Sequence, residues 1–154
     1  MRAHVTLLAL SSMGYALAQT SPTSADVAAK LRDARAQWQE AAVSDYLYGF
    51  NKFCECHRET PPETLVEVRE DVVTDVRHVM VRTGDTVAAA SDNFELYWTV
   101  DDLFGLLERA LQREAVVRAD FDPQFGVPRS IYVDYLPDMI GDELDVRITR
   151  FETR

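Results

Sequence analysis

The amphipathic stretch TVDDLFGLLERAL, residues 99–111, decides the fold of this chain. Thr99 is the expected N-cap of a helix, and Asp102 stands three residues later as a short version of the capping-box acid. One face of the helix is apolar, because hydrophobic side chains recur at three- and four-residue spacing: Val100, Leu103, Phe104, Leu107, Ala110 and Leu111. A helix with a single apolar stripe buries it against a second layer, and the flanking segments predict a sheet for that layer.

Three strands are predicted after this helix. Residues 116–121 alternate between apolar and polar side chains, and residues 122–126, DPQFG, predict a turn because Asp, Pro and Gly are typical turn residues. The two following strands show the same period of two. The apolar face of the first consists of Ile131, Val133 and Tyr135, and that of the second consists of Leu144, Val146 and Ile148.

One helix and three further strands are predicted before it. Ser24 is the expected N-cap of the first helix, whose apolar face consists of Val27, Leu31, Ala34 and Trp38. Residues 46–56 alternate as a strand, and residues 65–69 and 72–76 predict a hairpin around Glu70 and Asp71. Residues 83–93 are the least regular and predict a loop with a short strand.

The expected element order is therefore α-β-β-β-α-β-β-β. This order predicts an α+β fold in which two such units share one antiparallel sheet of about five to six strands, with both helices packed on one face. The chain has 154 residues, and residues 24–154 are long enough for one domain with a sizeable core.

The N-terminus has the pattern of a secretory signal peptide. A short basic n-region, MRAH, precedes a mostly apolar stretch, and Ala16-Leu17-Ala18 is an A-x-A cleavage site. The apolar stretch is shorter than the ~20 residues that cross a bilayer. We expect cleavage after Ala18, a flexible mature N-terminus at residues 19–23, a secreted or periplasmic location, and no membrane span after signal removal.

The charge of the chain excludes one class of partner. The formal net charge is −10 at pH 7, and lysine occurs only at Lys30 and Lys52. Binding to nucleic acid requires clustered lysine and arginine, so we expect no nucleic-acid partner.

Several motifs together resemble a known family. They are Trp38 before a tyrosine-rich strand, Cys54-Glu55-Cys56, the stretch TVDDLF at residues 99–104, and the stretch DPQFGVPRSI at residues 122–131. As an ordered set, they resemble a family of small secreted or lipid-anchored bacterial proteins that is catalogued only as a domain of unknown function. The resemblance implies a single α+β domain and supplies no reaction, ligand or catalytic residue.

Cys54 and Cys56 are the only cysteines in the chain. In an ideal strand their Cα atoms would lie roughly 7 Å apart, slightly beyond the ~4.4–6.8 Å span of a disulfide. Export into an oxidising compartment nevertheless favours a Cys54–Cys56 disulfide at a bend of the strand. The alternative is a redox or metal site, for which His57 and His78 are the additional candidate ligands.

Other polar and aromatic groups have ordinary structural explanations. The acidic residues Asp138, Asp142, Glu143 and Asp145 lack the spacing of a calcium loop and predict a solvated loop. Asp101 and Asp102 suit the positive N-terminus of a helix. The aromatic residues Trp38, Trp98, Tyr46 and Tyr48 are expected in the core or at its rim.

The sequence favours a non-catalytic function. It contains no nucleophile elbow, phosphate-binding glycine loop or zincin motif, and it predicts no cofactor. Our leading hypothesis is a secreted or periplasmic binding module for a protein or an envelope component. The alternative is a small redox or metal-binding protein centred on Cys54, Cys56 and His57.

Overall fold

The computed structural model describes residues 23–53, 63–80 and 82–154. These residues form two α-helices, one 3₁₀-helix and seven strands in a single sheet. In chain order the elements are α1 (Ser24–Ala41), β1 (Tyr46–Phe53), β2 (Glu63–Arg69), β3 (Val72–Val79), β4 (Thr86–Ala88), η1 (Ser91–Leu96), α2 (Val100–Gln112), β5 (Val116–Phe121), β6 (Pro128–Asp134) and β7 (Leu144–Thr153).

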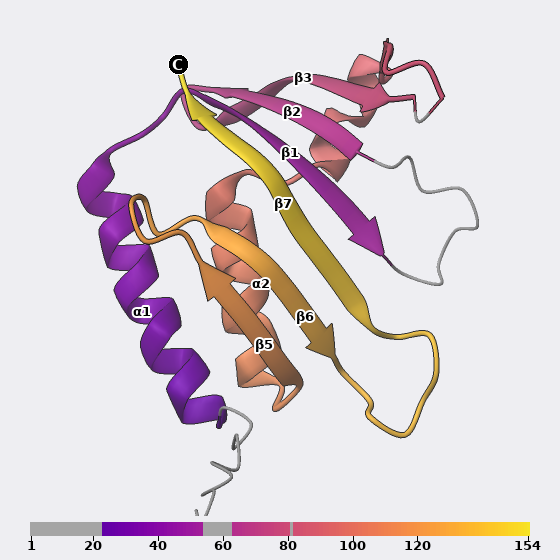
Figure 1. Ribbon diagram of the computed structural model, residues 1–154. Coiled ribbons are helices and arrows are strands. Elements are labelled where there is room, and N and C mark those ends of the chain that lie inside the picture. The colour runs from indigo at the N-terminus through magenta and orange to yellow at the C-terminus, as the bar shows by residue number, and fades with distance from the viewer. Residues whose placement is uncertain (1–22, 54–62, 81) are drawn as a thin grey trace, which may run out of the picture.

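All neighbouring strands are antiparallel, and their order across the sheet is β4-β3-β2-β1-β7-β6-β5. The first and last strands of the chain, β1 and β7, therefore pair at the centre. The strands before α2 lie on one side of this pair, and the strands after α2 lie on the other. Figure 1 shows α2 behind β5 and β6, with α1 beside β5. This arrangement confirms an α+β fold in which the two halves share one sheet.

The core lies between the sheet and the helices. Alternate strand residues are buried on the covered face, including Tyr46 and Tyr48 of β1 and Val66 and Val68 of β2. The predicted stripe of α2 supplies the other side, and Leu103, Phe104 and Leu107 are fully buried. The apolar periodicity of both helices is thus confirmed by burial.

The caps explain where each helix begins. In α2 the backbone N–H of Asp102 donates to Thr99 Oγ1 at 3.1 Å, and the N–H of Thr99 donates to Asp102 Oδ2 at 2.8 Å, which confirms the predicted capping box. In α1 the N-cap is Thr23 rather than the predicted Ser24. Thr23 forms the same reciprocal box with Asp26, and Ser24 is already the first helical residue.

The prediction of five to six strands was wrong, because the sheet has seven. The seventh strand is β4, which lies within residues 83–93, where a loop with a short strand was predicted but not counted in the sheet. It pairs with β3 through only three residues, Thr86, Val87 and Ala88. All three are exposed, so they carry none of the apolar alternation that marks a half-buried strand.

The turn between β5 and β6 fixes α1 against the sheet. Asp122 Oδ1 accepts the backbone N–H groups of Gln124 and Phe125, each at 2.9 Å, as predicted for a turn that starts with Asp. Gly126 follows with a φ of +75°, and a Cβ at this position would lie 2.1 Å from the carbonyl oxygen of Ala34 in α1. Only glycine permits this close contact.

Candidate functional site

Of the candidate residues of the predicted redox or metal site, His78 lies within the described part of the chain. Cys54, Cys56 and His57 lie outside the described residues, so the predicted disulfide stays a prediction. His78 lies on β3 opposite Thr64 of β2, and its Nδ1 is 3.2 Å from Thr64 Oγ1. Its Nε2 is 3.3 Å from the hydroxyl of Tyr97. Both ring nitrogens of His78 therefore already have hydrogen-bond partners on neighbouring elements.

Three of the four aromatic residues singled out by the sequence hold the start of α2. The indole N–H of Trp38 donates to Asp101 Oδ2 at 3.1 Å. The hydroxyl oxygen of Tyr46 accepts the N–H of Val100 at 2.9 Å, and the hydroxyl of Tyr48 donates to the carbonyl oxygen of Trp98. Their expected place in the core is confirmed, because all three are buried.

The same burial affects the titration of the two tyrosines. Desolvation raises the pKa of Tyr46 and of Tyr48 above the usual value for a phenol, so both hydroxyls stay protonated to a higher pH than an exposed tyrosine would. Trp98, the fourth aromatic residue, is half-buried at the rim, where its ring packs near Phe50 and lies 5.1 Å from Lys52 Nζ. These contacts stabilise the fold.

The acidic residues near residue 140 lie in the loop between β6 and β7 and at the start of β7. Asp142 Oδ2 accepts the backbone N–H of Leu136 at 2.7 Å, and Glu143 Oε2 accepts that of Gly141 at 2.9 Å. Asp145 forms an ion pair with Arg147 at 3.1 Å. Among the described residues, no group of three or more His, Cys, Asp or Glu is arranged to hold a metal ion. Asp142 and Glu143 instead bind the backbone of their own loop.

Apolar side chains occupy the outside of this loop. The exposed fractions are 88% for Ile140, 56% for Met139 and 52% for Leu136. We call these three residues the apolar tip. Figure 1 shows the loop extending beyond the end of the sheet, away from both helices. The usual arrangement is reversed here, because two carboxylates turn to the backbone and three hydrophobic side chains face solvent.

The apolar tip was not among the predicted sites. The acidic residues of this loop were candidates, and the hydrophobic residues between them were not. A usable signal was present, since Leu136, Met139 and Ile140 stand among Pro137, Asp138 and Gly141, residue types that favour a turn. Large apolar residues inside a strong turn signal cannot all enter the core.

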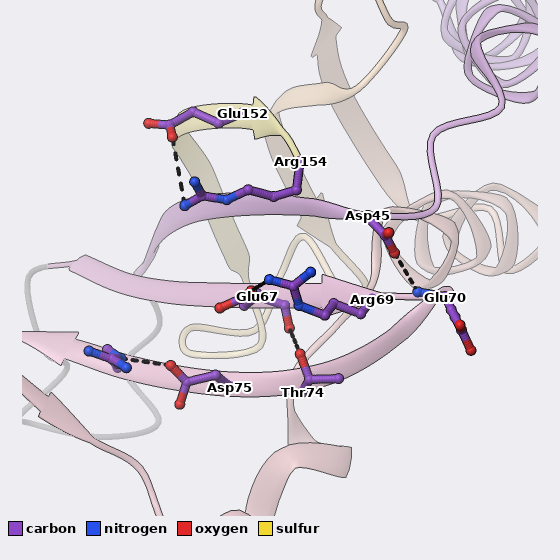
Figure 2. Close-up of polar contacts among 9 residues, drawn as sticks. Asp45, Glu67, Arg69, Glu70, Thr74, Asp75, Glu152 and Arg154 are labelled. Carbon is purple, nitrogen blue, oxygen red and sulfur yellow. Dashed lines mark hydrogen bonds and ion pairs between the residues drawn. The ribbon is translucent and has the colours of Figure 1, made fainter.

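The uncovered face of the sheet has a different character. Four acidic residues are each followed two positions later by an arginine, and this spacing places both side chains on one face of a strand. Figure 2 shows three of these pairs, among them Glu67–Arg69 on β2 and Glu152–Arg154 at the C-terminus, on the two sides of β1. Asp45, also shown there, accepts the N–H of Glu70 at 2.7 Å. The four ion pairs are Glu67–Arg69, Asp75–Arg77, Asp145–Arg147 and Glu152–Arg154.

The chain was compared with curated proteins, solved structures and family models. No curated protein and no solved structure matches the chain. In the part of the chain that the structure describes, no helix has the length and apolar character needed to cross a membrane. The model of a family of unknown function, DUF6174, matches residues 30–153, which include every element from within α1 to the end of β7. The chain therefore belongs to this family of unknown function.

Proposed function

We propose that this protein is an exported, non-catalytic binding module that contacts a protein partner through the apolar tip. The observation that carries the proposal is the 88% exposure of Ile140 on a loop whose own carboxylates hold its backbone in shape. Exposed apolar side chains lose contact with water when a partner covers them, and this is the main source of free energy in protein association.

The loop is built to present its tip in one conformation. Besides the two carboxylate contacts, the N–H of Met139 donates to the carbonyl oxygen of Leu136 at 2.7 Å, and Gly141 adopts a φ of +98° that favours glycine. A loop that is already ordered loses less conformational entropy on binding than a loop that must fold against its partner.

The charge around the tip indicates the chemistry of the partner. Asp138 is exposed beside Met139 and Ile140, and the chain carries a formal net charge of −10. A membrane with anionic lipids would repel such a surface, whereas a protein with an apolar recess and a rim of lysine or arginine would attract it. We therefore propose a protein partner with an apolar recess and a basic rim.

The proposed export is supported by residues 1–18 of the sequence, with their basic start, apolar stretch and A-x-A site. N-terminal sequencing of the chain recovered from the periplasm or the medium tests this part. We expect the mature protein to begin at Gln19, and recovery with Met1 retained would contradict it.

Site-specific photo-crosslinking in the producing cells tests the binding surface. A photoreactive phenylalanine analogue replaces Ile140 in one variant and Val72 in the control. Val72 is a suitable control because its exposed fraction is 62%, and it lies at the β2–β3 turn at the opposite end of the sheet.

We expect one adduct of defined mass from position 140 and none from position 72. Excess wild-type protein should suppress the adduct, whereas excess Met139→Asp protein should not. The same adduct from both positions, or none from position 140, would refute a contact through the apolar tip.

Our second candidate is a redox or metal-binding function centred on Cys54, Cys56 and His57. Export favours reactive or bonded thiols at this pair, but the proposed fourth ligand, His78, already contacts Thr64 and Tyr97. Mass spectrometry of the exported protein, with and without reductant and chelator, separates the two candidates. A mass loss with chelator would favour metal binding, and a gain of two hydrogens with reductant would identify the disulfide.

A further inference from the structure

The strands β6 and β7 separate halfway along β7. Their pairing ends at Ser130 and Arg147, although β7 continues to Thr153. On its other side this second half of β7 pairs with β1, for example through Arg150 and Gly49. Among the described residues, no turn or loop backbone hydrogen bond reaches residues 148–153. One edge of β7 is therefore open, although β7 lies in the middle of the sheet.

A hollow of about 410 Å³ lies along this open edge, between β7 and the β5–β6 turn. Its apolar lining comes from residues of the core or packed against it, among them Val127 and Ile148. Phe125 and Phe151 also line it, and their ring centroids are 5.6 Å apart. The volume falls within the range of about 300–1,000 Å³ that is usual for ligand pockets.

The backbone beside the hollow is irregular and firmly held. Thr149 is the extra residue of a β-bulge, since Arg150 lies opposite Gly49 and Ile148 lies opposite Phe50. Bulges are common next to functional sites, where they redirect a side chain or end a strand pairing.

Glu63 at the start of β2 holds this bulge in place. Its Oε1 accepts the hydroxyl of Thr149 at 2.6 Å and Nε of Arg150 at 3.1 Å, and its Oε2 accepts Nη2 of Arg150 at 2.9 Å. A Cβ at Gly49 would lie 2.7 Å from both Glu63 Oε1 and Thr149 Oγ1, so glycine makes room for this contact.

Two arginines, each paired with one carboxylate, lie at the rim of the hollow. Arg129 contacts Asp122 through one nitrogen at 3.2 Å, and its side chain is 64% exposed. Arg150 contacts Glu63 through Nε and Nη2, and its side chain is also well exposed. An arginine has five N–H donors in a planar fork, so each side chain can still donate to a carboxylate that enters the hollow.

We propose that this hollow binds an extended acidic peptide, which adds to the open edge of β7 as a short strand. The peptide backbone would satisfy those N–H and C=O groups of residues 148–151 that point away from β1, and alternate side chains would point toward the apolar lining. A carboxylate of the peptide would bind Arg129 and Arg150. This site is distinct from the apolar tip and does not depend on the function proposed for it.

A peptide selection on the full-length protein tests the proposal. Random peptides displayed on phage are selected on the Ile140→Asp variant, so that the apolar tip cannot capture them. The strongest binder is synthesised, and its Kd is measured by calorimetry for the wild type, Arg129→Glu and Arg147→Glu. Arg147 is a matched control, because its side chain is 63% exposed, it pairs with Asp145, and it lies in the half of β7 that pairs with β6.

We expect Arg129→Glu to weaken binding at least about tenfold and Arg147→Glu less than about twofold, where tenfold corresponds to 1.4 kcal/mol. N-methylation of alternate peptide amides should also abolish binding, because strand addition needs those N–H groups. In the wild type, the NMR signals of residues 148–151 should shift on titration, which requires no variant.

Three results would overturn the proposal. They are a selection that yields no binder, equal binding by the Arg129→Glu and Arg147→Glu variants, and an N-methylated peptide that binds as well as its parent. Each of these results leaves the proposal for the apolar tip unaffected, since the selection protein already lacks that surface.

Discussion

The open face of the sheet and the β6–β7 loop both carry acidic residues, but the two regions use them in opposite ways. On the sheet, each of four carboxylates pairs with an arginine two residues later, on the same strand or, for Arg154, directly after it. In the loop, Asp142 and Glu143 accept backbone N–H groups, and the apolar tip takes the outer surface.

The difference is that the charged side chains on the open face already have partners, whereas the hydrophobic side chains of the apolar tip are left uncovered. Paired charges on the sheet remain hydrated and gain little from a partner. The apolar tip keeps hydrophobic area in water, while one oxygen each of Asp142 and Glu143 accepts a backbone N–H of the same loop. The comparison therefore predicts that substitutions on the covered face will change stability, whereas substitutions at the tip will change binding.

The largest effect is expected where the sheet is covered. Phe104→Ala should lower the free energy of unfolding by about 3–5 kcal/mol, because Phe104 is fully buried between α2 and the sheet. Phe53→Ala is the matched control, since Phe53 is more than half exposed and should cost less than about 1 kcal/mol. Urea unfolding of both variants measures the difference, and equal losses would contradict the division into covered and open faces.

Local sequence rules predicted much of this scaffold. The stripe of α2 and its capping box follow from spacing within a few residues, and both are present. The rules were less exact where the signal was short or duplicated. A short strand was predicted within residues 83–93, but β4 has three exposed residues and no alternation, so its bounds and its place in the sheet did not follow from the sequence. Thr23 and Ser24 are both good capping residues. The box with Asp26 favours Thr23, which stands three residues before it.

An intermediate effect is expected inside the loop. Asp142→Ala should cost about 1–2 kcal/mol, because it leaves the N–H of Leu136 without its carboxylate partner. The amide of Leu136 should also exchange faster with deuterium. Asp138→Ala is the control, since Asp138 is exposed and forms no hydrogen bond within the described part of the chain. Equal exchange in the two variants would show that the carboxylate does not hold the loop.

A smaller effect is expected on the open face. Arg69→Ala removes one ion pair from β2, and exposed pairs of this kind contribute about 0.2–1 kcal/mol. Thermal unfolding at low and high salt checks this prediction, and the difference from the wild type should shrink as salt screens the pair. A large loss that salt does not reduce would mean that Arg69 stabilises the sheet by packing rather than by charge.

The site was less predictable than the scaffold. The acidic residues from Asp138 to Asp145 predicted a solvated loop, but the sequence does not show which side chains of this segment turn inward. That choice depends on where Asp142 lies relative to the N–H of Leu136, six residues away, and on the conformation of Gly141. The hollow beside β7 was equally hidden, because the separation of β6 from β7 follows from pairings between distant segments.

The smallest effect on stability, and the sharpest test of the comparison, is expected at Ile140. Ile140→Asp should change the free energy of unfolding by no more than about 0.5 kcal/mol, because the side chain contacts mainly water in the free protein. The same variant should no longer suppress the photo-crosslinked adduct formed from position 140 when it is added in excess.

Ile131→Asp provides the contrast, since Ile131 is buried on β6 and an unpaired charge there should prevent folding. If Ile140→Asp also destabilised the protein by several kcal/mol, the tip would belong to the core and the proposed binding surface would be lost. A stable variant that still competed fully would show that the partner binds elsewhere.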